Sequence, residues 1–181
     1  NCTFIDCGFD FSSSVVIDAC MLNFTYNSID FSECKQSCGC LELRQIQRHA
    51  IFGNTFRNSK SVNNSFVTGI NFVSIQDNFS LAIVNNTFDN IGGTCICLQA
   101  SSQNGLTFRN NTIKNIEEGE NLIKFVFHCE SDLFVVESCN FINNKYDKLT
   151  PQVWIEFSSG SKSDRFKYEL LFDDCLFENC S

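Results

Sequence analysis

Short alternations of apolar and polar residues recur along the chain, each broken by asparagine or cysteine. The clearest spans residues 106–116, LTFRNNTIKNI, where Leu106 and Phe108 alternate with polar residues as in a strand that buries one face. A polar pair, Asn110 and Asn111, interrupts the alternation, and Ile113 resumes it. The pattern predicts a strand, a corner and a second strand.

Seven frames of this kind are found when Asn111 is numbered zero. Position zero is always Asn or Cys, at Cys2, Cys20, Asn54, Asn86, Asn111, Cys139 and Cys175. Position +2 is always large and apolar, at Phe4, Leu22, Phe56, Phe88, Ile113, Phe141 and Phe177. Position +4 is asparagine in five frames, at Asn58, Asn90, Asn115, Asn143 and Asn179. Asp6 and Phe24 replace it in the first two frames.

Apolar residues also recur before position zero, as expected for the strand that leads into the corner. Position −3 is apolar at Ile17, Ile51, Ile83, Phe108, Val136 and Phe172. Position −5 is apolar at Val15, Leu81, Leu106, Phe134 and Leu170. His49 is the exception at −5, and it falls in the cationic segment 44–50, RQIQRHA, which we interpret as a solvated turn.

The spacing of the frames predicts a β-solenoid. Successive frames lie about 29 residues apart on average, within the range of stacked supersecondary repeats. Their period of two, broken by Asn, differs from the three-and-four spacing of a helical repeat. A third apolar segment lies between frames, at 95–98, 122–127 and 153–157. We therefore expect an all-β parallel β-helix, one domain over residues 1–181, with about six to seven rungs of three short strands.

Other stretches are assigned by their place between the frames. Residues 1–7, NCTFIDC, read as the second strand of a rung that lacks its first, and the coil is expected to be open at both ends. Residues 23–35 are predicted to be a polar excursion and residues 38–43 a third strand. The pattern blurs over 59–79, which could supply a strand or two, and 158–164, SSGSKSD, reads as a loop.

Stacked rungs would place equivalent residues in ladders along the axis, about 4.8 Å apart. The chain has 20 Phe against one Trp, three Tyr and one Met, which fits a core built from one repeating aromatic residue. Asparagine suits the corners because it tolerates left-handed backbone conformations. An inward Asn column can also satisfy its amides from rung to rung.

This repeating frame resembles the right-handed parallel β-helices of the pectin-lyase-like superfamily. The Asn- and Phe-rich surface proteins of protists and the polymorphic outer-membrane proteins of some bacteria are the most similar members. The resemblance covers nearly the whole chain and implies a right-handed parallel β-helix. It implies no single activity, because this fold hosts lyases, hydrolases, adhesins and inert fibres.

Charge argues against two classes of partner. Charged residues make up 19% of the chain, the net charge is −8, and no basic run is present, so we expect no nucleic-acid binding. The longest apolar runs have only the length of a strand, so we expect no membrane insertion. The chain begins without Met or a signal-peptide pattern, and we interpret it as a mature or excised piece of a secreted protein.

The 12 cysteines are numerous for this length. They are Cys2, Cys7, Cys20, Cys34, Cys38, Cys40, Cys95, Cys97, Cys129, Cys139, Cys175 and Cys180. Structural disulfides are the favoured interpretation and imply an oxidising compartment. The ladder geometry would pair Cys2 with Cys20 and Cys139 with Cys175. Zinc is a weaker alternative because only His49 and His128 could join the thiols and no pair of CxxC motifs occurs. The third interpretation is that the cysteines are buried free thiols.

Seven Asn-x-Ser/Thr sequons agree with an extracellular or cell-surface location: Asn1, Asn23, Asn63, Asn78, Asn85, Asn110 and Asn179. Asn1, Asn85 and Asn110 share position −1, which predicts N-linked glycans along one edge of the solenoid. The alternative is that Asn-rich corners followed by Thr create sequons by accident.

Catalytic chemistry is not evident in the sequence. Asp173 and Asp174 form the best acidic pair, but they are adjacent and would point to opposite faces. Asp6, Asp18 and Asp89 are scattered over other frames, and Arg165 and Lys167 are expected to make only surface ion pairs. No phosphate loop, GxSxG elbow or HExxH motif occurs. We expect no enzymatic activity, no cofactor and no metal.

Three functions remain open. The first is an extracellular structural glycoprotein, a β-helical building block of a surface filament or coat that joins copies of itself head to tail. The second is a surface adhesin, for which Trp154 beside Glu156, predicted to point outward, would be the contact. The third is a polysaccharide lyase or hydrolase.

Overall fold

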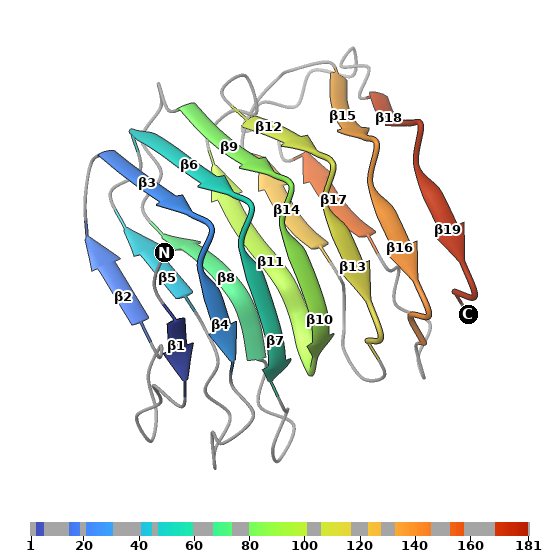
Figure 1. The fold of residues 1–181 in the computed structure, drawn as a ribbon. Helices are drawn as coiled ribbons and strands as arrows, with labels where there is room; N and C mark the ends of the chain where they lie inside the picture. The colour runs from blue at the N-terminus through green and yellow to red at the C-terminus, as the bar shows by residue number, and fades with distance from the viewer. Residues whose placement is uncertain are drawn as a thin grey trace.

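The computed structural model describes residues 3–5, 15–18, 21–30, 41–44, 47–59, 67–73, 80–100, 106–116, 123–127, 133–145, 153–157 and 169–180. All regular elements in these ranges are strands, and they form three parallel sheets that run along one coil (Figure 1). Each strand pairs with the strand three places earlier or later in the chain. This confirms the predicted parallel β-helix with three short strands per rung.

The three sheets are numbered by the order in which a rung visits them. Sheet 1 contains β3 (Met21–Thr25), β6 (Arg48–Phe52), β9 (Ser80–Val84), β12 (Leu106–Arg109), β15 (Leu133–Glu137) and β18 (Glu169–Asp173). Sheet 2 contains β1 (Thr3–Ile5), β4 (Ser28–Asp30), β7 (Thr55–Ser59), β10 (Thr87–Ile91), β13 (Thr112–Lys114), β16 (Asn140–Ile142) and β19 (Leu176–Glu178). Sheet 3 contains β2 (Val15–Asp18), β5 (Leu41–Arg44), β8 (Val67–Val73), β11 (Gly93–Ala100), β14 (Ile123–Phe127) and β17 (Val153–Phe157).

The core is the stack of inward side chains that the frames predicted. In sheet 2, position +2 runs in register through Phe56, Phe88, Ile113, Phe141 and Phe177. The first four are fully buried, and the rings of Phe56 and Phe88 stack with centroids 5.1 Å apart. Phe177 is 49% exposed, so the prediction that it would be buried is wrong. It lies in β19, an edge strand of the described sheet, and no further rung covers it.

The second predicted frame is out of register. The structure pairs β4 with β7, so that Ile29 lies beside Phe56, and pairs β3 with β6, so that Phe24 lies beside Ile51. Position zero of this rung is therefore Asn27 rather than Cys20. Phe24 is at −3 rather than at +4, and Leu22 is at −5 rather than at +2. The predicted polar excursion over 23–35 is thus wrong over 23–30, which contain most of β3 and all of β4.

The shift in register originates at residues 15–18, whose alternation predicts the strand before a corner. They form β2, which pairs with β5 in sheet 3. Val15 and Ile17 therefore belong to the third strand of the first rung. A third strand alternates with the same period as a first strand, so the sequence pattern alone did not separate them.

The prediction that His49 lies in a solvated turn is also wrong. It lies inside β6, beside Leu22 of β3 and Leu81 of β9, and its side chain is 3% exposed. Position −5 therefore faces inward in this rung too, and His49 occupies a core position. Arg48, the preceding residue, is exposed, as expected for a neighbour on the opposite face of the strand.

Each rung turns at two corners where the backbone is left-handed. Position −1 has positive φ at Tyr26, Gly53, Asn85, Asn110, Ser138 and Asp174. Position +4 has positive φ at Asn58, Asn90, Asn115, Asn143 and Asn179. Asparagine tolerates this conformation better than most residues, which explains its repetition at +4.

Candidate functional site

A column of buried asparagines runs along the corner between sheets 1 and 2. Its members are Asn27, Asn54, Asn86 and Asn111, all nearly fully buried at position zero. The Oδ1 of Asn86 accepts hydrogen bonds from the backbone N and the Nδ2 of Asn54, both at 3.0 Å. Asn27 and Asn54 are joined in the same way, as are Asn86 and Asn111. The side chains of Asn54, Asn86 and Asn111 therefore each accept two hydrogen bonds from the rung before.

The same amides also satisfy carbonyls of the preceding rung. The Nδ2 groups of Asn54, Asn86 and Asn111 donate to the position −3 carbonyl oxygens of Phe24, Ile51 and Ile83 at 2.7, 2.8 and 2.9 Å, respectively. A buried amide without partners would cost stability, so the repetition of the column keeps each amide satisfied. The hydrogen bonds of this column therefore join successive rungs.

Cysteine replaces asparagine in the last two described rungs of the column. Burial raises the pKa of the Cys139 thiol to about 11, although hydrogen bonds from the backbone and side chain of Asn111 act in the opposite direction. Cys139 Sγ donates to Glu137 O at 3.2 Å, and Cys175 Sγ donates to Val136 O at 3.2 Å. The Val136 carbonyl is at −3 of the preceding rung, so Cys175 takes the place of an asparagine Nδ2.

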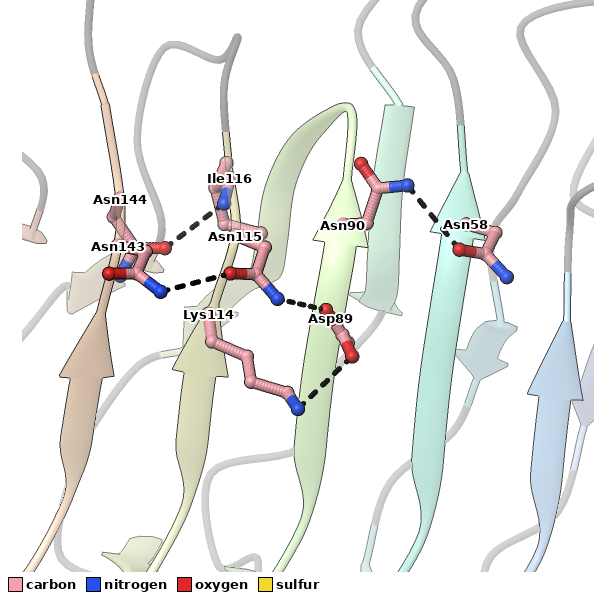
Figure 2. Close-up of polar contacts among 8 residues, drawn as sticks. All are labelled: Asn58, Asp89, Asn90, Lys114, Asn115, Ile116, Asn143 and Asn144. Carbon is pink, nitrogen blue, oxygen red and sulfur yellow. Dashed lines mark hydrogen bonds and ion pairs between the residues drawn. The ribbon is translucent and has the colours of Figure 1, made fainter.

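A second column of asparagines lies at the exposed corner that follows sheet 2, at position +4 (Figure 2). Asn179 donates to Asn143, Asn143 to Asn115, and Asn90 to Asn58, with Nδ2–Oδ1 distances of 3.1, 3.3 and 3.3 Å. Asn115 donates instead to Asp89 Oδ1 at 2.8 Å. The five asparagines form the predicted column, and their side-chain amides bond to one another on either side of the interruption at Asp89.

Charged residues beside this corner pair between rungs. Lys114 Nζ lies 3.2 Å from Asp89 Oδ2, and Arg57 Nε lies 2.8 Å from Asp30 Oδ2 (Figure 2 shows the first pair). Such solvent-accessible pairs contribute little to stability. Asp89, which the sequence places apart from the other acidic residues, therefore forms a local ion pair with Lys114.

The acidic pair is placed as the sequence indicated, at the corner before Cys175. Asp173 ends β18, Asp174 has positive φ, and both are exposed. Glu137 is the register neighbour of Asp173, and Ser138 Oγ donates to Asp174 Oδ2 at 3.5 Å. The described residues contain no group of three side chains suited to hold a metal ion. Asp6, Arg165 and Lys167 lie outside the described residues, and of Asp18 only the backbone is described, opposite Arg44.

Five of the twelve cysteines are described: Cys95, Cys97, Cys139, Cys175 and Cys180. All five are free thiols, so the disulfide prediction finds no support among them. Burial raises the pKa of Cys95 far above its ordinary value and also raises that of Cys97, against the effect of nearby Lys124. Cys2, Cys7, Cys20, Cys34, Cys38, Cys40 and Cys129 lie outside the described residues, as does His128.

Four of the seven sequons are described. Asn85 and Asn110 occupy successive position −1 corners and are exposed, Asn23 is exposed in β3, and Asn179 is exposed after β19. Asn1, Asn63 and Asn78 lie outside the described residues. Trp154 and Glu156 lie in β17, but their side chains are not described, so the adhesin contact stays a prediction.

The last described rung presents a different kind of site. Strands β17, β18 and β19 each have a partner strand on one side only. Leu171, Leu176 and Phe177 are 44, 47 and 49% exposed, and the Phe172 ring contacts Phe177 edge-on at 5.6 Å. Figure 1 shows these strands at the opposite end of the coil from β1. An edge of this kind combines unpaired backbone groups with apolar surface.

Sequence reasoning missed two buried asparagines, Asn27 and Asn144. Asn27 lies 27 residues before Asn54, a spacing close to the average repeat, and this signal could have found it. Asn144, at position +5 of its rung, is buried; it accepts from Ile116 N at 3.2 Å and donates to Ile113 O at 3.0 Å. Its equivalents in earlier rungs are Ser59, Ile91 and Ile116, so asparagine does not recur there and does not mark the position.

In the part of the chain that the structure describes, no helix is long and apolar enough to span a membrane. No family model, no curated protein and no solved structure matches this chain. The resemblance to the pectin-lyase-like superfamily therefore stays a prediction from the repeat pattern.

Proposed function

We propose that this chain is a non-enzymatic structural building block of an extracellular filament or coat, assembled by adding rungs end to end. The observation that carries the proposal is Phe177, which continues the buried core stack yet is 49% exposed. Its ring already stacks on Phe141, with centroids 4.6 Å apart and planes 4° from parallel. The free face of Phe177 suits another ring in the same position.

The first rung has a strand in the same register that could pair with β19 of another copy. Thr3–Ile5 occupies position +1 to +3 of sheet 2, as Leu176–Glu178 does at the other end. Phe4 would therefore meet Phe177 if β1 of a second copy paired with β19. By sequence count Cys2 and Cys7 would meet Cys175 and Cys180, since both pairs hold positions zero and +5.

Parallel pairing sets the symmetry of such a contact. Every strand pair in the described coil is parallel, so a second copy continues the sheets only with its strands pointing in the same direction. Such a head-to-tail contact uses different surfaces on the two partners and does not close on itself. The expected product is an open filament rather than a dimer.

A longer covalent array is the rival explanation, with the next rung supplied by the same polypeptide. The 181-residue chain by itself separates the two explanations, because only self-association makes the particles grow with concentration. We expect sedimentation to show oligomers above micromolar concentration and electron microscopy to show fibres of uniform width. Discrete single units at all concentrations would contradict assembly.

A matched pair of substitutions tests the contact surface. Phe177→Asp places a charge in the core stack, whereas Leu176→Asp places one on the outward face of the same strand at similar exposure. End-to-end stacking predicts that the first abolishes oligomers and the second preserves them. Equal loss from both would indicate a side-by-side contact instead.

The proposal includes N-linked glycans and secretion. Asn85 and Asn110 support it because both sequons are exposed at equivalent corners of successive rungs. Glycans on this flank would leave the coil ends free for stacking. Peptide mapping after enzymatic deglycosylation of protein secreted from a eukaryotic host is the test, and unmodified Asn85 and Asn110 would remove this part of the proposal.

A further inference from the structure

Cys139 and Cys175 are successive members of the position-zero column. The strands that follow them pair in register, Asn140 beside Leu176, and Leu176 N donates to Cys139 O at 2.9 Å. Equivalent positions on adjacent parallel strands are about 4.8 Å apart, inside the Cα–Cα range that a disulfide requires. The backbone therefore already holds the two cysteines at a bonding separation.

The surroundings of the two thiols also place them near each other. The Cys175 thiol lies close enough to Cys139 to help raise the pKa of Cys139, and both cysteines replace asparagines whose amides interact directly in earlier rungs. Cys139 is buried and Cys175 is half-buried. A small-molecule oxidant can thus reach Cys175 first.

Cys180 has a different neighbour. It holds position +5 of the last described rung, and Asn144 holds the same position one rung earlier, with its Nδ2 3.9 Å from Cys180 Sγ. Cys180 Sγ donates to Phe141 O at 3.3 Å. An amide, not a thiol, therefore faces Cys180 from the preceding rung.

From this difference we infer that Cys139 and Cys175 form a disulfide that joins two successive rungs of one chain. Cys180 is then the thiol of this rung that remains available to a second copy. The first statement stands on the geometry of the column alone, and the second rests on the proposed end-to-end assembly.

The chemistry needs a low-molecular-weight disulfide, such as oxidised glutathione, as the oxidant. The Cys175 thiolate attacks one sulfur of that disulfide and releases one glutathione thiolate. Cys139 then loses its proton to solvent, attacks Cys175 Sγ and displaces the second glutathione thiolate. Two protein thiols are oxidised and one oxidant molecule is reduced to two thiols.

The buried position of Cys139 makes the second step slow near neutral pH. Its pKa is raised to about 11, and the attacking thiolate fraction grows about tenfold for each pH unit below the pKa. Ring closure from the mixed disulfide should therefore be about 100-fold faster at pH 9 than at pH 7.

Peptide mapping tests the bond directly. Reduced protein is oxidised with glutathione disulfide at pH 9, alkylated, and digested with trypsin and a glutamate-specific protease. These cuts separate 138–145 with Cys139, 170–178 with Cys175 and 179–181 with Cys180. We expect 138–145 linked to 170–178 as the main form of both peptides. Alkylated thiols at both positions, or Cys175 linked to any other cysteine, would overturn the inference.

Three serine variants complete the design. Cys139→Ser should stop the reaction at a glutathione adduct on Cys175. Cys180→Ser should keep the 138–145 to 170–178 link and remove covalent oligomers, whereas Cys175→Ser should keep those oligomers. If no variant or wild-type chain forms oligomers, end-to-end assembly fails, while the linked peptide still decides the intrachain bond. Covalent oligomers that require Cys175 but not Cys180 would contradict the assignment of Cys180.

Discussion

The buried asparagine column shows how one residue type can be required by its neighbours. Asn86 accepts two hydrogen bonds from Asn54 and donates to Asn111 and to the Ile51 carbonyl. Removing its amide leaves several groups unpaired in the corner. The free energy lost when a column residue is replaced therefore depends on three successive rungs rather than on its own rung alone.

The first prediction compares the two asparagine columns. Asn86→Ala should lower the free energy of unfolding by about 3 kcal/mol or more, because each buried group left unsatisfied costs about 1–3 kcal/mol. Asn90→Gly removes an exposed amide at a positive φ that glycine accepts, and should cost less than about 1 kcal/mol. Urea denaturation of both variants is the measurement. Similar losses would show that the buried column carries no special energy.

The second prediction concerns the aromatic core. Phe88 is fully buried and stacks on Phe56, so Phe88→Ala should cost about 3–5 kcal/mol. Leu176→Ala is the control, because its side chain is 47% exposed on the outward face of β19. A Phe88→Ala loss no larger than that of the control would argue against the continuous stack.

The third prediction concerns His49, whose two ring nitrogens have no hydrogen-bond partner. Desolvation lowers its pKa from the ordinary value of 6.5, so the unfolded chain binds the proton more readily than the folded one. Stability should therefore fall as the pH drops below about 6.5, by at most about 1.4 kcal/mol for each pH unit. The register neighbours of His49 are Leu22 and Leu81, and neither of these side chains is titratable.

The matched variant is His49→Leu, which continues the leucines on either side of it. Melting temperatures of both proteins between pH 8 and pH 5 give the difference due to His49. We expect the variant to be more stable at pH 5 and to lose less stability on acidification. Parallel profiles would mean that the imidazole is not buried as described.

At the scale of elements, the sequence predicted the strands correctly in the five frames from Asn54 onward. The frames at Asn54, Asn86, Asn111, Cys139 and Cys175 all fall at the junction of sheets 1 and 2. The prediction of the second rung is wrong because β2 alternates like a strand before a corner, whereas Asn27 lies in a polar stretch that is typical of a loop. Apolar period alone does not say which of three sheets a strand joins.

The polar and edge features were harder to predict for physical reasons. His49 reads as solvated because Arg48 and Arg44 flank it in sequence, yet alternation turns its side chain inward. Phe177 holds the core position +2, and it is exposed only because it lies in an edge strand. The exposure of Phe177 depends on whether a further strand lies beside β19, which the local pattern does not encode.

The fourth prediction tests the packing between elements at Gly69 in β8. A Cβ built there would lie 2.6 Å from the carbonyl oxygen of Cys95 in β11, a backbone atom that cannot move freely. Gly69→Ala should force β8 and β11 apart and cost about 1–3 kcal/mol. Asn71→Ala, at a half-buried position of the same strand, should cost less. Thermal unfolding of the two variants distinguishes a local clash from general weakness of β8.

For the whole molecule, stability should follow the order of the rungs. In a solenoid each repeat contacts only its neighbours, so an edge rung has one stabilising interface and an inner rung has two. In the described coil, β9 and β10 each have a partner strand on both sides, whereas β18 and β19 each have a partner strand on one side only. The edge strands should therefore open more often than the inner ones.

The last prediction uses single amide protons at that edge. Leu176 N donates to Cys139 O in the preceding rung, and successive N–H groups of a strand point to opposite sides. The Phe177 N–H therefore points to the open edge. In the dilute protein it should exchange with solvent far faster than the Leu176 N–H. If a second copy adds its first rung, the Phe177 amide becomes protected while the Leu176 amide changes little. Exchange measured by NMR or mass spectrometry at low and high protein concentration gives both rates. Particles that form while the Phe177 amide keeps its fast exchange would show that the copies meet elsewhere than at the end of the coil.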